Sequence, residues 1–192
     1  MVLKKVKTAV FISGTGSNLK NLIKFSLLKN SPIQIDLIIS NNIKAKGLKF
    51  AKFYNIKKKT YNFKHMPLSE KAILQELKVD KIKLICLAGF MKILSKDFIK
   101  KFKGKIINIH PSLLPKYKGL NTHERAINNN EKFSGCTVHY VTSKLDAGKI
   151  ILQKKVKISK RDNPKSLELK ILRQEHKIYP KAIVKISANL KK

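Results

Sequence analysis

Asn108 and His110 are the residues whose types and spacing best fit catalytic chemistry. They stand two positions apart at the end of the apolar run 105–109, and strand side chains alternate between faces, so both should point to one side. An amide beside an imidazole suits acyl transfer, because the amide can donate to a developing oxyanion while the imidazole moves a proton. A lone strand histidine is more often structural, but the rigid loop Pro111–Pro115 that follows favours a functional role.

The segment Ser13-Gly14-Thr15-Gly16-Ser17-Asn18 is a second candidate site, because it follows an apolar run and precedes apolar residues at helical spacing. Glycines let the backbone approach a ligand, and free amides at a helix start bind anions, so phosphate is the expected ligand. The dinucleotide fingerprint is not met, since Leu19 stands at the third glycine position. The alternative is a tight turn in which Ser17 or Asn18 caps the helix.

Asp146, in Leu145-Asp146-Ala147-Gly148, is a candidate partner for the histidine. A carboxylate near His110 would raise the pKa of the imidazole and orient the ring. From the residues alone, a turn between two β segments is the simpler interpretation of Asp146.

Alternating strands and helices are expected to position these residues. Apolar runs predict strands at 6–12, 33–39, 58–63, 84–88, 105–109, 137–142 and 150–158. Helical spacing predicts helices containing residues 19–27, 44–54, 68–77, 95–101 and 122–128, and a last one from Pro164 to Val184 that Pro180 could interrupt. The βαβ rhythm implies a parallel sheet with 84–88 at its centre and ligands beyond the strand ends. The final residues 190–192 are expected to fray.

Length and composition favour a single globular domain over residues 1–192, with 43% hydrophobic residues. No apolar run approaches the roughly 18 residues of a membrane helix, so neither a membrane partner nor export is expected. Cys86 and Cys136 lie in apolar contexts without metal-ligand spacing. They are expected to be buried, reduced thiols of a cytoplasmic protein that binds no metal.

The formal charge of +32 allows two interpretations. A basic surface gains affinity for nucleic acid by releasing counterions. However, only three of the 43 basic residues are arginine, and the lysines are scattered rather than clustered. Compositional drift is therefore favoured, no specific nucleic-acid partner is expected, and the charge should attract a small anionic substrate.

Four segments in one order resemble the glycinamide ribonucleotide formyltransferase family, within the folate-dependent formyltransferase superfamily. They are Ser13-Gly14-x-Gly16-Ser17-Asn18-Leu19, Leu87–Leu94, the Asn-x-His-Pro-Ser-Leu-Leu-Pro block in Ile107–Tyr117, and Leu145–Gln153. The likeness runs from Val6 to about Pro180. It implies a single formyltransferase domain, in which a Rossmann-like N-terminal parallel sheet is extended by C-terminal β segments into a mixed sheet flanked by helices.

The resemblance also implies an activity, the transfer of a formyl group from 10-formyltetrahydrofolate to the amino group of 5-phosphoribosylglycinamide in de novo purine biosynthesis. Asn108 would stabilise the oxyanion, His110 would transfer the proton, and Asp146 would support the charge on the histidine. Residues implied for the glycinamide ribonucleotide are Gly16, Ser17 and Asn18 at its phosphate, and Glu175. Residues implied for the folate co-substrate are Met91, Lys92, Ile93, Leu94 and Asn108.

Some positions depart from the family pattern. Lys92 stands where arginine is frequent, Lys118 replaces a common proline, and Asn121 replaces the first histidine of a His-Thr-His pattern. A ligand-binding arginine that the family carries in mid-chain is missing, because this sequence has no arginine before Arg125. Either Lys64 or Lys71 is expected to substitute as a point charge.

Three rival functions remain. Methionyl-tRNA formyltransferases share the Asn, His and Asp constellation, but they are similar only over the core and add a tRNA-binding domain for which no residues are expected here. Formyltetrahydrofolate hydrolases normally carry an extra N-terminal domain. A basic nucleic-acid-binding protein on the same core is the third. Two geometric expectations accompany the main interpretation: Asp146 within reach of His110, and a cis peptide bond between Leu114 and Pro115.

Overall fold

The fold is described by a computed structural model that covers residues 5–190. Its strands are β1 (Val6–Ile12), β2 (Ile33–Ser40), β3 (Lys57–Thr60), β4 (Leu84–Leu87), β5 (Lys105–His110), β6 (Phe133–Tyr140) and β7 (Ile150–Lys157). Its helices are α1 (Ser17–Ser26), α2 (Lys49–Phe53), α3 (Met66–Val79), α4 (Lys96–Lys101), α5 (Thr122–Asn128) and α6 (Pro164–Ser187). Short 3-10 turns are η1 (Lys46–Leu48), η2 (Phe63–His65) and η3 (Ala188–Leu190). The sequence analysis expected residues 190–192 to fray. Leu190 is the last residue of η3, and residues 191–192 lie outside the described range.

All seven strands form one sheet in the order β3-β2-β1-β4-β5-β6-β7. The first five are parallel, and β6 and β7 add as an antiparallel pair. The mixed sheet that the family resemblance implied is therefore confirmed, and β4 lies at its centre, as its continuous apolar run predicted. The strand order reverses between β1 and β4, and the crevice beyond such a switch point is where open α/β sheets bind ligands.

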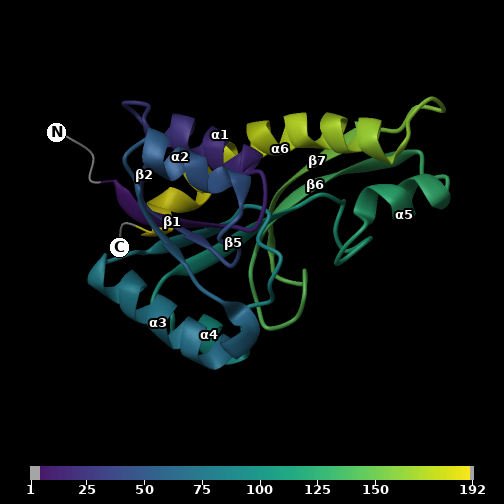
Figure 1. Cartoon of the computed structure of the whole chain (residues 1–192). Helices are drawn as coiled ribbons and strands as arrows, with labels where there is room; N and C mark the ends of the chain where they lie inside the picture. Colours follow the sequence, from purple (N-terminus) through teal and green to yellow (C-terminus); the bar gives the residue numbers. More distant parts are fainter. Residues whose placement is uncertain (1–4, 191–192) are drawn as a thin grey trace.

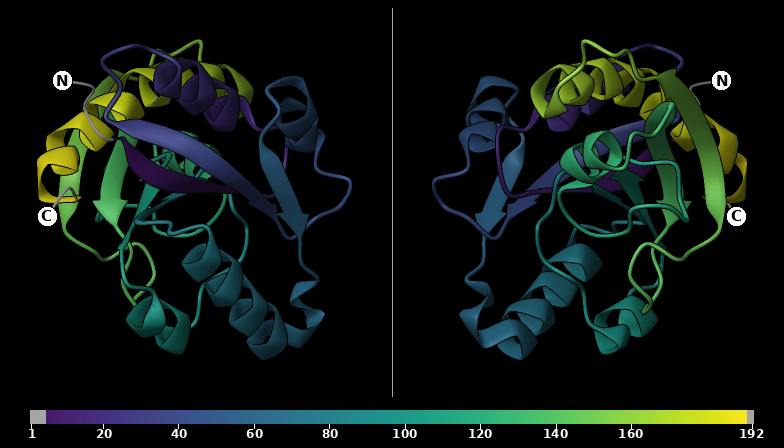
Figure 2. Two further views of the ribbon diagram at one scale, coloured as in Figure 1. Left: turned by 90° about the vertical axis from the view of Figure 1, so that its left-hand side faces the viewer. Right: turned by 90° about the vertical axis from the view of Figure 1, so that its right-hand side faces the viewer.

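Helices cover both faces of the sheet. Figure 1 shows α1, α2 and α6 on one side and α3 and α4 on the other, and the side views in Figure 2 show the twisted sheet between these layers. Val10 and Phe11 are adjacent in β1, yet each is fully buried in a different one of the two hydrophobic clusters. A strand buried on both faces reads as an unbroken apolar run, as β4 does, and β1 and β2 read as mostly apolar, which is why these strands were recognisable in the sequence.

Two strands differ from the sequence-based expectation by three or more residues at one end. Strand β3 ends at Thr60 rather than Phe63, because the Asn62 side chain accepts a hydrogen bond from the Lys64 amide and starts η2. Strand β6 begins at Phe133 rather than at residue 137. Ser134 and Gly135 interrupt the apolar pattern in its early part. Gly135 must be glycine, because a Cβ there would overlap the Lys154 carbonyl oxygen on β7.

Helix α6 continues through Pro180, so the expected interruption is wrong. A proline has no N–H to donate to the carbonyl four residues earlier, which here belongs to His176. The Asn21 side chain on α1 donates to that carbonyl at 2.8 Å and replaces the missing bond. The helix therefore continues without a break from Pro164 to Ser187. None of the helices within residues 5–190 has the length and apolar character needed to cross a membrane.

Candidate active site

Asn108 and His110 lie on one face of β5 at its carboxyl end, as their spacing predicted. In the sheet, Asn108 pairs with Leu87 of β4 on one side and with His139 of β6 on the other. Both line a cavity of about 850 Å³ at this edge of the sheet. The loop after His110 has the cis peptide bond between Leu114 and Pro115 that the sequence led us to expect.

His110 is almost fully buried and has a protein partner at each ring nitrogen. Its Nε2 lies 2.8 Å from the Tyr117 carbonyl oxygen, and its Nδ1 lies 3.4 Å from Asp146 Oδ2. Both partners are acceptors, and the shorter contact, to the Tyr117 carbonyl, places the proton of the neutral ring on Nε2. Nδ1 is then the nitrogen that can take a second proton. The resulting imidazolium would face the Asp146 carboxylate, which fits the supporting role expected for that residue.

Asp146 reaches the histidine from the connection between β6 and β7. It has a positive φ of 46°, and Gly148 in the same turn must be glycine, because a Cβ would overlap the Tyr140 carbonyl. The Gly119 amide donates to Asp146 Oδ2 at 2.9 Å, which holds the carboxylate against the loop after β5. Asp146 is thus a turn residue, as the simpler interpretation had it, and also a neighbour of His110.

His139 on β6 is a site residue that the sequence analysis missed. Its Nδ1–H donates to the Tyr140 carbonyl at 2.9 Å, so Nε2 is free to accept, and it accepts from Asn108 Nδ2 at 3.2 Å. With Nε2 unprotonated, its separation of 3.6 Å from Asp146 Oδ1 is not an ion pair. This bond orients the Asn108 amide and leaves the second hydrogen of Nδ2 available for a ligand. Only the cross-strand register places His139 opposite Asn108, and a sequence pattern does not reveal register.

Burial lowers the pKa of His139 below the ordinary value of 6.5, and a pH dependence of stability follows. The unfolded chain takes up a proton as the pH falls through about 6.5, whereas the folded protein resists, so acid destabilises the fold. We expect the free energy of unfolding to fall between pH 7 and pH 5. We also expect His139→Gln to reduce that fall, by about 1.4 kcal/mol for each unit of pKa depression. Urea unfolding of both proteins at the two pH values measures it, and equal pH slopes would contradict the assignment.

The glycine segment connects β1 to α1 in a form suited to an anion. Gly16 is the N-cap of α1 with a left-handed φ of 74°, and no side chain caps the helix. The alternative, a cap by Ser17 or Asn18, is therefore wrong, and the first amides of α1 are left without a side-chain acceptor. A Cβ on Gly16 would also stand 2.7 Å from the Gly47 Cα, so both backbone angle and space require glycine.

Asn18 and Glu175 meet in the lining of the cavity, although they are far apart in the sequence. Asn18 Nδ2 donates to Glu175 Oε2 at 2.7 Å, and both side chains are buried. Burial raises the pKa of Glu175, while the bond from Asn18 opposes that shift. Asn18 Oδ1 is buried with no hydrogen-bond partner in the described part of the chain. An unsatisfied buried oxygen that lines a cavity is available to a ligand with hydroxyl donors.

The segment 91–94 lines the same cavity from the end of β4. Met91 and Ile93 are 63% and 64% exposed, whereas Leu94 is buried. The Met91 amide donates to Ser13 Oγ at 2.7 Å, which ties this segment to the glycine segment. Exposed apolar side chains at a cavity mouth are typical of a surface that a ligand covers.

The expected replacement for the family's mid-chain arginine is not found where the sequence suggested. Neither Lys64 nor Lys71 lines the cavity, and the cations that do line it are Lys92, Lys144 and Lys165. Lys165 is paired with Glu168 at 2.8 Å. No group of three or more His, Cys, Asp or Glu side chains within residues 5–190 is placed to hold a metal ion.

An amide and a carboxylate-backed imidazole at the carboxyl end of β5 are the groups that an enzyme of acyl-group transfer uses. The formyl transferase family model matches residues 6–183, and the chain belongs to that family.

Individual relatives agree with this assignment. The chain is 45% identical over 183 residues to a phosphoribosylglycinamide formyltransferase from Haemophilus influenzae, covering 92% of this chain and 85% of the relative. It is 44% identical to the human trifunctional purine biosynthetic protein adenosine-3, covering 94% of this chain but only 18% of that much longer protein. The crystal structure of phosphoribosylglycinamide formyltransferase from Brucella melitensis superposes with a TM-score of 0.91 at 40% identity, covering 96% of this chain and 97% of that one.

Proposed function

We propose that this enzyme transfers the formyl group of 10-formyltetrahydrofolate to the amino group of 5-phosphoribosylglycinamide. The observation that carries the proposal is a single cavity with three parts: the Asn108 and His110 pair, the anion-suited Gly16–Asn18 segment, and the apolar segment 91–94. The bacterial relatives are named for this activity on a phosphorylated substrate.

The reacting groups divide the chemistry as follows. Attack of the substrate amine on the formyl carbon puts negative charge on the formyl oxygen, and the free N–H of Asn108 Nδ2 donates to that oxygen. His110 Nδ1 takes the proton that the attacking amine loses. Asp146 stabilises the imidazolium until the proton passes to the leaving nitrogen, so no net charge stays in the site.

The two substrates would bind to different parts of the cavity. The phosphate of the ribonucleotide is assigned to the first amides of α1 at Gly16, Ser17 and Asn18, where the helix dipole and free N–H groups favour an anion. Glu175 and the unpartnered Asn18 Oδ1 are acceptors for hydroxyl groups of the same substrate.

The pteridine end of the folate is assigned to the apolar segment Met91, Lys92, Ile93 and Leu94. The exposed Met91 and Ile93 side chains and the buried Leu94 side chain line an apolar part of the cavity, which suits a flat heterocycle. Lys92 adds a cation to this part of the cavity lining.

An assay with purified protein, 10-formyltetrahydrofolate and 5-phosphoribosylglycinamide tests the function. We expect formylated ribonucleotide and stoichiometric loss of the folate formyl group. Replacing the ribonucleotide by its dephosphorylated form should raise KM by about tenfold or more, because charge-assisted hydrogen bonds to a phosphate contribute about 1.5–3 kcal/mol. Formylation of methionyl-tRNA alone, or release of formate without an acceptor, would reassign the enzyme to one of the rival activities.

Partners, location and domain structure are part of the same proposal. We propose that the partners are these small molecules, with no specific nucleic acid and no membrane, and that residues 1–192 form one formyltransferase domain. A cytoplasmic location is supported by Cys86 and Cys136, which are buried, unpaired thiols. Burial raises the pKa of each thiol to about 12, so neither is a reactive thiolate.

A further inference from the structure

Tyr117 contacts the candidate catalytic histidine through its backbone rather than its side chain. Its carbonyl oxygen accepts the Nε2–H of His110 at 2.8 Å. Tyr117 has a positive φ of 54°, a conformation that costs a residue with a Cβ about 1–2 kcal/mol. Surrounding contacts must hold such a residue in place, so the carbonyl position depends on what anchors the Tyr117 side chain.

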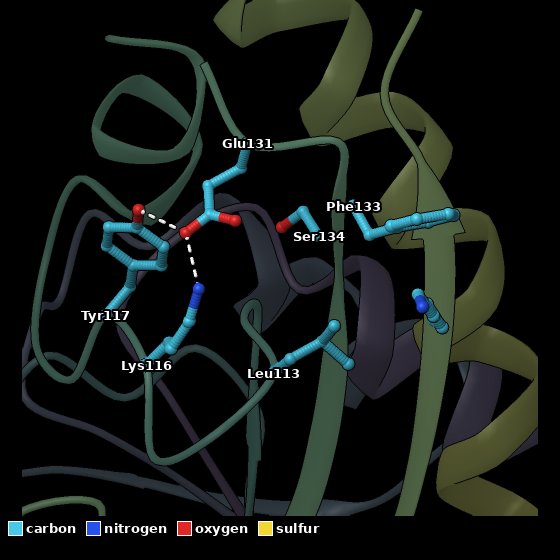
Figure 3. Close-up of a pocket in the computed structure, with 7 residues that line it drawn as sticks. Leu113, Lys116, Tyr117, Glu131, Phe133 and Ser134 are labelled. Atoms are coloured by element: carbon cyan, nitrogen blue, oxygen red, sulfur yellow. Dashed lines mark hydrogen bonds and ion pairs between the residues drawn. The ribbon is translucent and has the colours of Figure 1, made fainter. Parts of the chain in front are cut away.

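That side chain is anchored on the outer side of the loop, away from the cavity. Figure 3 shows the Tyr117 hydroxyl and the Lys116 ammonium converging on one oxygen of Glu131, with donor distances of 2.9 and 2.7 Å. Asn129 Nδ2 donates to the same hydroxyl at 3.0 Å, and the Arg125 guanidinium lies 5.1 Å from the centre of the Tyr117 ring. We call Tyr117, Lys116 and Glu131 the latch.

Glu131 gives the latch a fixed charge. Hydrogen bonds from Lys116 and then Tyr117 lower the pKa of Glu131, so the carboxylate remains ionised through the neutral range in which a histidine titrates. Groups that face His110 itself come from three other elements: Asp146 before β7, His139 on β6 and His123 on α5. The charge of the latch therefore stays constant over this pH range.

We propose that Tyr117 is a positioning residue for His110. The latch holds the Tyr117 carbonyl in place, so that the His110 ring keeps its proton on Nε2 and presents Nδ1 as the basic nitrogen. Asp146 and the Tyr117 carbonyl then accept from opposite ends of the imidazolium that forms during turnover. The inference rests on the proposed formyl transfer, because it assigns a role to the proton that this reaction moves.

Tyr117→Phe tests the latch, since it removes the hydroxyl and keeps the ring against Arg125. We expect kcat to fall about fivefold, the factor that corresponds to one hydrogen bond of about 1 kcal/mol, with KM unchanged for both substrates. Tyr54→Phe is the matched control, because the Tyr54 side chain is also half-buried and its hydroxyl makes no hydrogen bond within residues 5–190.

A second variant separates positioning from a general loosening of the loop. Glu131→Ala should reproduce the Tyr117→Phe effect, and the double variant should be no slower than the slower single variant, because both act through one carbonyl. Additive losses, a rise in KM with kcat unchanged, or a faster Tyr117→Phe enzyme would overturn the proposal. Thermal melting of each variant identifies a loss caused by unfolding.

The proton on His110 can also be observed without turnover. Nitrogen NMR of unliganded protein labelled in histidine should show His110 protonated on Nε2, and Tyr117→Phe should add the tautomer protonated on Nδ1, which donates to Asp146. An unchanged tautomer in the variant would contradict the latch even if the enzyme transfers formyl groups. A wild-type protein without activity would contradict the proposed function and leave this measurement valid.

Discussion

His110→Ala is expected to lower kcat for formyl transfer by about a thousandfold, within the range for loss of a general acid–base group. The imidazole places Nδ1 3.4 Å from Asp146 Oδ2, and alanine offers no proton acceptor. KM for the ribonucleotide should change little, because its phosphate is assigned to the Gly16–Asn18 segment. Steady-state kinetics with each substrate varied in turn measures both constants.

The control for this variant is His65→Ala, since His65 is an exposed histidine remote from the cavity lining. It should retain wild-type kinetics. Full activity in His110→Ala would remove the histidine from the mechanism, whereas an equal loss in both variants would point to a general effect of losing a histidine.

Asn108→Ala is expected to lower kcat by about a hundredfold, as is typical for removal of one donor to an oxyanion. His139→Leu should cause a smaller loss, because it leaves the Asn108 amide in place without the 3.2 Å bond that orients it. His139→Gln should recover part of that loss, since its amide oxygen can accept the same hydrogen bond. The three variants are compared by kcat at saturating concentrations of both substrates.

Asn128→Ala serves as the control here, because Asn128 is exposed at the end of α5. A His139→Leu enzyme as slow as Asn108→Ala would mean that His139 acts directly on the substrate. An Asn108→Ala enzyme with unchanged kcat and raised KM would make Asn108 a binding residue only.

The sequence predicted the interior of this fold better than its edges. β4 appears as a continuous apolar run, and the other well-buried strands, β1 and β2, are mostly apolar, so that the positions of all three were predicted to within a residue. Edge strand β3 consists of exposed lysines and a threonine, and its end is set by a side-chain hydrogen bond at Asn62. Local polar contacts of this kind leave no periodic signal.

The site was predictable to the extent that one strand carries it. Asn108 and His110 share β5, so alternation along the strand was enough to pair them. Asp146 and His139 reach the site through the β6–β7 turn and the cross-strand register, both of which depend on how distant segments pack. Proximity of Asp146 was expected through the family resemblance, and His139 was not expected at all.

The proline in α6 bears on the length of substrate that this enzyme can bind. The carbonyl freed by Pro180 accepts from Asn21 of α1, and one turn earlier on α1 Asn18 bonds to Glu175. Both bonds fix the sliding position of α1 against α6, and α1 begins at the proposed phosphate site. The bond that the missing N–H of Pro180 makes possible thus helps to fix the distance between the proposed phosphate position and the Glu175 carboxylate. That distance limits the length of ligand that can contact both.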